Sequence, residues 1–369
     1  MTQGNDTARR AADLLHHRAA GLAKGEALSP PILPAVTFHL PEVEGAAHIY
    51  GRNGQPGWDA VEAQLALLED APCVAFPSGM AAISAALVAT LRAGDRVVLP
   101  SDGYYVTRVL AREFLAGFGV TVTELPTLDY AGSDFAGAAV VYLESPSNPG
   151  LDLLDIRAVA ARAKAAGAVV IADNTTMTPL LQRPLDMGCD MVVAADTKAP
   201  AGHSDVLFGH VASRDAAILG RVRDWRRLSG AVPGPFEAWQ VARGLETLEV
   251  RLARMCASAQ VIAERLAAHP RVRGLRYPGL PTDPGHALAR AQMEGFGFLI
   301  GFALEDADRA EAFLAACPHL ARTTSFGGTH SSGERRARWG DPVAPGYIRL
   351  SVGLEPVEVL WSGFAAALG

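Results

Sequence analysis

The sequence predicts an α/β fold in which a mainly parallel sheet is covered by helices on both faces and is followed by a smaller α+β domain. Between residues 58 and 234, short apolar runs alternate with helix-like stretches, a pattern typical of buried parallel strands joined by helices. This alternation stops around residues 225–234. A long helical pattern then precedes three strand-like segments, which indicates a second domain of mixed structure.

Seven short apolar runs are the expected strands of the large sheet. They cover residues 73–76, 96–99, 120–125, 138–143, 168–172, 191–194 and 206–211. Their lengths are those of ordinary strands, and helix-like stretches such as residues 80–92 and 156–166 lie between several of them. We therefore expect a mainly parallel sheet of seven strands.

The two ends of the chain differ from this pattern. Residues 1–57 lack sustained periodicity and hold four prolines between residues 30 and 41; such a segment stays ordered only by lying on something else. We expect an N-terminal arm (residues 1–57) that contacts a neighbouring subunit, a large domain (58–234) and a C-terminal small domain (235–369). In the small domain, residues 235–270 predict one long helix or two, and the strand-like segments are 272–277, 295–302 and 347–352.

Composition excludes several classes of protein. The chain has 369 residues, 49% of them hydrophobic and 20% charged, which is typical of a well-packed globule. A net charge of −6 without a basic block argues against nucleic acid as a partner. The longest clean apolar stretch, residues 81–91, is too short to span a bilayer, and no secretory signal is visible. Four scattered cysteines favour free thiols in the cytoplasm over a disulfide framework, and we expect no metal site.

Lysine is scarce, and one lysine stands out. The chain has only Lys24, Lys164 and Lys198. Lys24 lies in the arm, and Lys164 lies in an Ala-rich helical stretch where it is expected to face water. Lys198 follows an apolar run and precedes a turn that contains Gly202. Because ligands of open α/β sheets bind beyond the carboxyl ends of strands, Lys198 is a candidate Schiff-base nucleophile. Taken alone, it would more often be an ordinary surface lysine.

Three further strand ends carry matching chemistry. Asp173 ends a buried run, where a carboxylate needs a cationic or donor partner; the protonated ring nitrogen of pyridoxal phosphate (PLP) is one, and a helix N-cap is the alternative. Gly79 and Met80 open an apolar helix, whose free N–H groups suit a phosphate. Asn148 ends another run and could be plain turn chemistry. Together, four strand ends offer a phosphate cradle, an amide, a carboxylate and a lysine.

Sequence motifs from Tyr50 to the C-terminus extend this pattern. They are YGR (50–52), PSGMAAI (77–83), ESPSNP (144–149), ADNT (172–175), TK (197–198), GHSD (202–205), RGLETL (243–248), YPGL (277–280), SFGG (325–328) and RLSVGLE (349–355). With them the chain resembles the Cys/Met-metabolism PLP family, which includes cystathionine γ-synthase, cystathionine β- and γ-lyases and methionine γ-lyase. The resemblance implies PLP as cofactor and the PLP-dependent transferase fold (aspartate aminotransferase-like, fold type I).

The resemblance also implies roles around the cofactor. Lys198 would form the Schiff base with PLP and then move protons, and Asp173 would pair with the pyridinium nitrogen. Tyr104 would stack on the ring. The amides of Gly79 and Met80, joined by Thr197, would hold the phosphate.

Other implied roles concern the substrate and the assembly. Arg349 would clamp the substrate α-carboxylate, a bidentate task suited to guanidinium, assisted by Asn148 and Ser325. Tyr50 and Arg52 would reach the phosphate of a neighbouring subunit, which makes the active unit a dimer and, by family habit, a homotetramer.

Three departures from the family pattern bear on specificity. Ala195 stands where a serine often contacts the phosphate, and Thr324 stands where a glutamate often precedes the Ser of SLGG. The run after Tyr104 contains no cysteine, which counts against methionine γ-lyase. Residues 325–341 resemble a shorter bacterial branch that usually carries the name cystathionine γ-lyase. Its polar residues either replace the missing contacts or form a solvated loop; they are His330, Arg335, Arg336 and Arg338.

The resulting leading hypothesis is γ-elimination of L-cystathionine to cysteine, 2-oxobutanoate and ammonia. Cystathionine γ-synthase (γ-replacement) and β-lyase (β-elimination) activities remain as alternatives. A PLP-binding homologue without catalysis is a remote one, which the intact Lys198, Asp173 and Arg349 oppose. A dinucleotide-binding dehydrogenase is disfavoured, because the nearest glycine-rich run (295–297) does not open a first βα unit.

Overall fold

The computed structural model describes residues 3–42 and 44–369 and contains one large and one small sheet. The large sheet has seven strands in the order β1-β7-β6-β5-β4-β2-β3. Only β7 runs antiparallel to its neighbours, so the expected mainly parallel sheet of seven strands is confirmed. The strands are β1 Cys73–Phe76, β2 Arg96–Pro100, β3 Thr121–Leu125, β4 Val140–Glu144, β5 Val169–Asp173, β6 Met191–Ala194 and β7 Gly209–Ala212.

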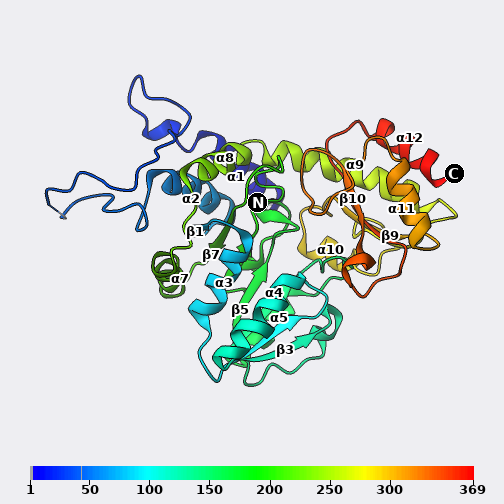
Figure 1. Ribbon diagram of the computed structural model, residues 1–369, viewed down its shortest axis with the longest axis horizontal. Coiled ribbons are helices and arrows are strands. Elements are labelled where there is room, and N and C mark those ends of the chain that lie inside the picture. Colours follow the sequence, from blue (N-terminus) through cyan, green and yellow to red (C-terminus); the bar gives the residue numbers. More distant parts are fainter. Residues whose placement is uncertain (1–2, 43) are drawn as a thin grey trace.

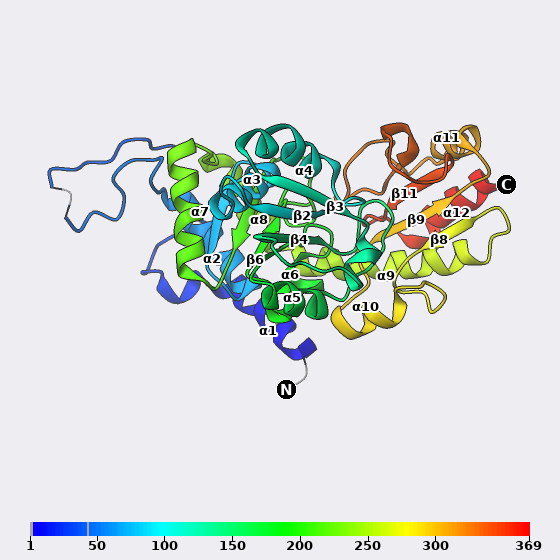
Figure 2. The same cartoon turned by 90° about the horizontal axis from the view of Figure 1, so that it is seen from below.

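Helices cover both faces of this sheet, which explains the apolar runs. On one face lie α3 (Gly79–Thr90), α4 (Tyr105–Leu110) and α7 (Ala216–Ser229); α5 (Ile156–Ala165) and α6 (Thr178–Leu181) lie on the other (Figure 2). α2 (Pro56–Glu69) packs against β1 and against α8 (Pro235–Leu245). Every residue of β1, β4, β6 and β7 is buried, as expected for strands covered on both sides.

The small sheet is antiparallel, in the order β10-β11-β9-β8. Its strands are β8 Arg273–Arg276, β9 Leu299–Ala303, β10 Ser332–Arg335 and β11 Tyr347–Ser351. The helices around it are α9 Leu248–Ala267, α10 His286–Gln292, α11 Ala307–Ala316 and α12 Val357–Leu368 (Figure 1). β10 was not expected, because its sequence Ser-Gly-Glu-Arg has no apolar side chain. It forms through its pairing with β11.

The long helical pattern after residue 235 is two helices, and their junction lies under the Lys198 turn. The Arg251 guanidinium of α9 donates hydrogen bonds to the backbone oxygens of Ala199, Pro200 and Gly244. A Cβ on Gly244 would lie 2.7 Å from the oxygens of Pro200 and Ala201. The absence of a side chain at Gly244 therefore lets α8 approach the turn that carries Lys198.

The N-terminal segment contains more regular structure than its sequence suggested. Residues Gln3–His16 form α1, which packs on α2 and buries Leu14. Asp6 accepts hydrogen bonds from Arg10 and from Arg183 of the large domain, both 3.0 Å long. The expectation of no periodicity was wrong here, because one buried leucine and a few ion pairs suffice to dock a short helix.

The rest of the segment before α2 extends away from the body (Figure 1). It exposes apolar side chains such as Leu28 and Val36. Its expected contact with a neighbouring subunit, and the expected domain boundaries at residues 57 and 234, stay predictions. Among residues 3–42 and 44–369, no helix is both long and apolar enough to cross a membrane.

Candidate active site

Lys198 lies in the turn between β6 and β7, with its amine turned toward the small domain. Its Nζ donates a 2.8 Å hydrogen bond to the hydroxyl of Ser325 and lies 5.1 Å from the centre of the Phe326 ring. Burial, with the nearby Arg349 charge, lowers the pKa of Lys198 to about 8. An amine with a lowered pKa is available as free base, which suits attack on an aldehyde.

Ser325 itself has an unusual backbone conformation. Its φ of 80° falls in the left-handed region, which costs a non-glycine residue about 1–3 kcal/mol. Such conformations gather at functional sites because the surrounding structure must hold them in place. Here the strained residue presents its hydroxyl to Lys198 and its carbonyl oxygen to Arg349 (3.3 Å).

Asp173 ends β5, and its carboxylate accepts hydrogen bonds of 3.0 Å from the Tyr142 hydroxyl and from the Thr175 amide. Burial raises the pKa of Asp173, against the effect of these hydrogen bonds and of Lys198. Within residues 3–42 and 44–369, no cation lies in salt-bridge distance of it. A buried carboxylate without a cationic partner suits a protonated ring nitrogen.

Tyr104 comes just before α4 at the same edge of the sheet. Its amide donates a 2.6 Å hydrogen bond to the Glu144 carboxylate at the end of β4. The side chain is 37% exposed, and its ring makes an edge contact with Tyr105. This anchored backbone and free ring fit the stacking role that the resemblance implies for Tyr104.

The start of α3 fits a phosphate site. Ser78 caps the helix by accepting from the Ala81 amide, and the first-turn N–H groups of Gly79 and Met80 have no partners within the helix. A Cβ on Gly79 would lie 2.5 Å from the Cβ of Ala195, so the helix start is pressed against the segment that leads to Lys198. The hydroxyl of Thr197 accepts from the Phe208 amide and donates to the Phe208 carbonyl oxygen. In this arrangement its hydrogen is not available to a phosphate.

Arg349 of β11 completes the site from the small domain. Its guanidinium donates to the side-chain oxygen of Asn148 (2.6 Å) and to the carboxylate of Glu334 (2.5 Å). Burial and the neighbouring Arg336 charge lower the pKa of Arg349 to about 10. Lys198, Ser325, Asn148 and Arg349 therefore form one cluster, although they come from four separate stretches of sequence.

Glu334 is the residue that the sequence reasoning missed. It is 1% exposed and also accepts from Arg336 (2.7 Å) and from the Trp339 ring N–H (2.9 Å). Burial would raise the pKa of Glu334, but the Arg349 and Arg336 guanidinium groups hold it below its ordinary value. The signal was the dense run Gly-Glu-Arg-Arg-Ala-Arg, in which a single acid stands among arginines.

Arg336 is buried and pairs with Glu334 and Asp341, so the solvated-loop interpretation is wrong for this residue. Arg335 pairs with Glu311 on α11 (2.9 Å). Arg338 is exposed, and its guanidinium lies 3.6 Å from Glu334. Arg336 and Arg338 thus lie around the carboxylate that accepts from Arg349.

A cavity of about 420 Å³ lies beside this cluster. Its lining includes Thr197, Asp205, Thr324, Ser325, Phe326 and His330. His330 and Thr324 thus line the same cavity as Ser325, which accepts from the Lys198 amine; the expected role of this run in specificity stays a prediction.

Tyr50 and Arg52 do not join this cluster. Arg52 donates to the backbone oxygen of Arg227 at the end of α7 (3.3 Å) and lies 5.5 Å from the Tyr50 ring. Both side chains are exposed. Any contact that they make with a cofactor must therefore involve another subunit, and this stays a prediction.

Comparison with known proteins decides the family. The family described as "Cys/Met metabolism PLP-dependent enzyme" matches residues 14–369. The chain belongs to this family. It is a PLP-dependent enzyme of carbon–sulfur amino-acid metabolism, and the buried Asp173, the half-buried amine of Lys198 and the start of α3 fit the donor set that PLP needs.

Relatives of this PLP enzyme carry several activities in their names. A provisionally named cystathionine gamma-lyase of Streptomyces coelicolor is 46% identical over 92% of this chain and 89% of its own length. An L-methionine gamma-lyase of Pseudomonas putida is 37% identical over 96% of both chains. The crystal structure of a cystathionine gamma synthase from Xanthomonas oryzae pv. oryzae, with aminoacrylate and cysteine, superposes with a TM-score of 0.92 over 97% of both chains at 32% identity. The fold class is confirmed.

Proposed function

We propose that the protein is a cystathionine γ-lyase, which converts L-cystathionine and water to cysteine, 2-oxobutanoate and ammonia. The proposal rests on the cavity of about 420 Å³ beside Ser325, the residue whose hydroxyl accepts from the Lys198 amine. Cystathionine carries a second amino-acid group on its distal half. Asp205 and His330 in the lining suit an ammonium and a carboxylate better than the methyl group of methionine. The Streptomyces coelicolor relative supports the same activity.

Arg349 binds the α-carboxylate of the substrate in this proposal. A guanidinium has five N–H donors, and three are used by Asn148, Glu334 and the Ser325 carbonyl. The other two, the Nε–H and one Nη1–H, have no partner among the described residues, and one of them donates to the α-carboxylate in this proposal. Glu334 and Asn148 fix the plane of the guanidinium and so set the position of the substrate Cα relative to Lys198.

Lys198 holds the cofactor before the reaction and moves protons during it. PLP, when bound, supplies an electron sink for the charge that proton removal leaves at Cα. With the substrate bound, the Lys198 amine would be placed to take the Cα proton and to return protons to the carbon skeleton. Loss of a second proton, from Cβ, and cleavage of the Cγ–S bond would release cysteine, whose thiolate takes up a proton. Water would then hydrolyse the remaining four-carbon fragment to 2-oxobutanoate and ammonia. The hydrogen bond to Ser325 orients the amine toward this path.

Two other reactions of the family use the same cluster. In γ-replacement a thiol adds to Cγ, and in β-elimination the Cβ–S bond breaks instead. The synthase and β-lyase names among relatives keep both as alternatives. The intact Lys198, Asp173 and Arg349 oppose a homologue that binds PLP without catalysis.

Product identity tests the proposal. Purified, PLP-loaded protein is incubated with L-cystathionine, and the keto acid is identified by mass spectrometry. The proposal expects 2-oxobutanoate and cysteine in equal amounts. Pyruvate with homocysteine would make the protein a β-lyase. No keto acid, together with cystathionine formation from an activated homoserine ester and cysteine, would make it a synthase. Lys198→Ala is the control and should lower turnover by about 10²- to 10⁴-fold.

We also propose a dimer as the smallest active unit, with two dimers forming a tetramer. The support is the position of Tyr50 and Arg52, which lie outside the cluster of their own chain. The exposed apolar side chains of the extended segment, such as Leu28 and Val36, fit a surface that a second subunit covers.

A further inference from the structure

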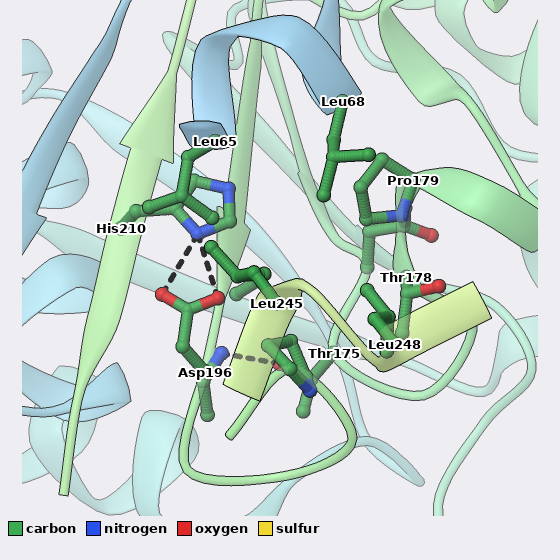
Figure 3. A pocket seen from close by; sticks show the side chains of 13 residues that line it. Leu65, Leu68, Thr175, Thr178, Pro179, Asp196, His210, Leu245 and Leu248 are labelled. Atoms are coloured by element: carbon green, nitrogen blue, oxygen red, sulfur yellow. Dashed lines mark hydrogen bonds and ion pairs between the residues drawn. The ribbon is translucent and has the colours of Figure 1, made fainter. Parts of the chain in front are cut away.

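Three buried ionisable side chains lie behind the Lys198 turn, on the side of α2. The imidazole of His210 in β7 lies between the carboxylates of Asp196 and Glu69, and Figure 3 shows its contact with Asp196. Its Nδ1 is 3.0 and 2.9 Å from the two carboxylate oxygens of Asp196. Its Nε2 is 3.3 Å from the carboxylate of Glu69, the last residue of α2. All three side chains are at most 1% exposed.

The geometry favours a charged imidazole. A neutral imidazole has a single N–H and could donate to one carboxylate only, whereas an imidazolium donates from both nitrogens. Burial alone would lower the pKa of His210, but the Asp196 and Glu69 carboxylates raise it to about 10. Leu65, Leu245 and Leu248 surround the group (Figure 3) and leave no room for a water molecule. The contacts therefore lie in a dry setting, where charge–charge contacts are strong.

Asp196 connects this ion triad (Glu69, His210 and Asp196) to the cofactor cluster. It stands two residues before Lys198, and its backbone oxygen accepts from the Ala201 amide (2.9 Å). On one side of it, Ala195 packs against Gly79 at the start of α3. On the other, Thr197 bonds to Phe208, two residues before His210. A shift of the Asp196 carboxylate would therefore displace both the phosphate cradle and the lysine.

Stability alone does not account for three buried charges at this place. Apolar side chains of the same volume often serve stability as well as, or better than, a buried ion network. An ion network fixes positions as well, because each carboxylate must stay within hydrogen-bond distance of a particular imidazole nitrogen. The residue in question is Asp196, whose backbone is part of the turn itself.

We propose that the Glu69–His210–Asp196 triad positions residues 195–198, so that the α3 start and the Lys198 amine meet the phosphate and the aldehyde of the cofactor together. These are positioning residues, because none touches the substrate or the reacting atoms. The inference rests on the proposed role of Lys198 as the cofactor-bearing residue.

The test compares two matched variants, Asp196→Asn and Glu69→Gln. Each removes one buried carboxylate charge from His210 and keeps the shape, but only Asp196 belongs to the turn. PLP is titrated into each apoenzyme, and the induced circular dichroism of the bound cofactor is recorded. Asp196→Asn should weaken PLP binding about 10- to 100-fold and reduce the dichroism, whereas Glu69→Gln should change both far less. PLP binding and dichroism that remain at the wild-type level in both folded variants would overturn the proposal.

Two controls keep the outcomes distinct. If Asp196→Asn does not fold, Asp196→Glu is used instead, which keeps the charge but moves it by one methylene. Asp196→Glu should also bind PLP more weakly than Glu69→Gln. Equal PLP binding by these two variants would contradict the proposal that Asp196 positions residues 195–198. Borohydride reduction of wild-type enzyme, followed by peptide mapping, shows whether PLP is attached at Lys198. Attachment elsewhere would contradict the proposed role of Lys198. Attachment at Lys198, together with wild-type PLP binding by both variants, would contradict only the role of the triad.

Discussion

At the scale of single residues, the environment of Lys198 sets when its amine reacts. With a pKa of about 8, the free-base fraction of the Lys198 amine rises about tenfold per pH unit well below that value, reaches one half at it and is nearly complete only about a pH unit or more above it. The rate constant for PLP capture by apoenzyme should therefore increase about tenfold per pH unit below 8 and level off above it. Stopped-flow absorbance of the captured cofactor measures this rate.

Arg349 provides the control for this pH dependence. Its charge is one cause of the lowered Lys198 pKa. In Arg349→Met the midpoint of the capture rate should move to higher pH, because an opposing positive charge has been removed. A midpoint that stays in place, or moves to lower pH, would contradict the cause assigned here.

Glu334 carries the largest expected stability effect at this scale. Glu334→Gln leaves the buried Arg349 without its carboxylate and Arg336 with Asp341 alone, and breaking a buried pair costs about 3–5 kcal/mol. The matched control is Glu311→Gln, which removes the partner of Arg335 at a site where Glu311 is 39% exposed; such a surface pair contributes about 0–1 kcal/mol. Urea unfolding measures both. Equal losses would show that the Glu334 network does not act as a buried unit.

At the scale of elements, the junction of α8 and α9 supports the Lys198 turn. Gly244→Ala would place a Cβ against the oxygens of Pro200 and Ala201, and we expect it to lower stability by about 1–3 kcal/mol and to weaken PLP binding. Gly220→Ala in α7 is the control, since nothing lies within 4 Å of its Cβ position; it should raise helix stability by about 0.5–1 kcal/mol. Thermal unfolding of both variants shows whether Gly244→Ala is destabilising because of the close approach at this position or because a helix glycine has been replaced.

Elements with strong local patterns were predictable from sequence, and those that depend on tertiary contacts were not. The buried strands β1 and β6 were placed to the residue, because strands covered on both faces must be apolar along their whole length. α1 and β10 were missed, since α1 depends on Leu14 docking on α2 and β10 depends on pairing with β11. The same distinction holds in the site. Asp173 and Lys198 stand at strand ends, whereas Glu334 is defined only by the arginines that meet around it.

At the scale of the whole molecule, the separation of Tyr50 and Arg52 from the cluster predicts complementation between subunits. Lys198→Ala and Arg52→Ala are co-expressed with different tags, and the mixed oligomer is purified through both. One of the two sites in a mixed dimer then has an intact Lys198 and an intact Arg52 from the other chain. Random pairing of the two chains should give about a quarter of wild-type activity before sorting. A mixture no more active than the separate variants would mean that each chain builds its own site.

A single lysine, Lys198, is proposed to carry the cofactor. It lies close to Arg349, because both side chains contact Ser325. The chain has only three lysines, so one measurement decides the matter. PLP-loaded protein is reduced with borohydride, digested and mapped by mass spectrometry. We expect the reduced pyridoxal phosphate adduct on the peptide that contains Lys198 and not on the peptides that contain Lys24 or Lys164. Labelling at Lys24 or Lys164 alone, or no labelling of a protein that binds PLP, would contradict it.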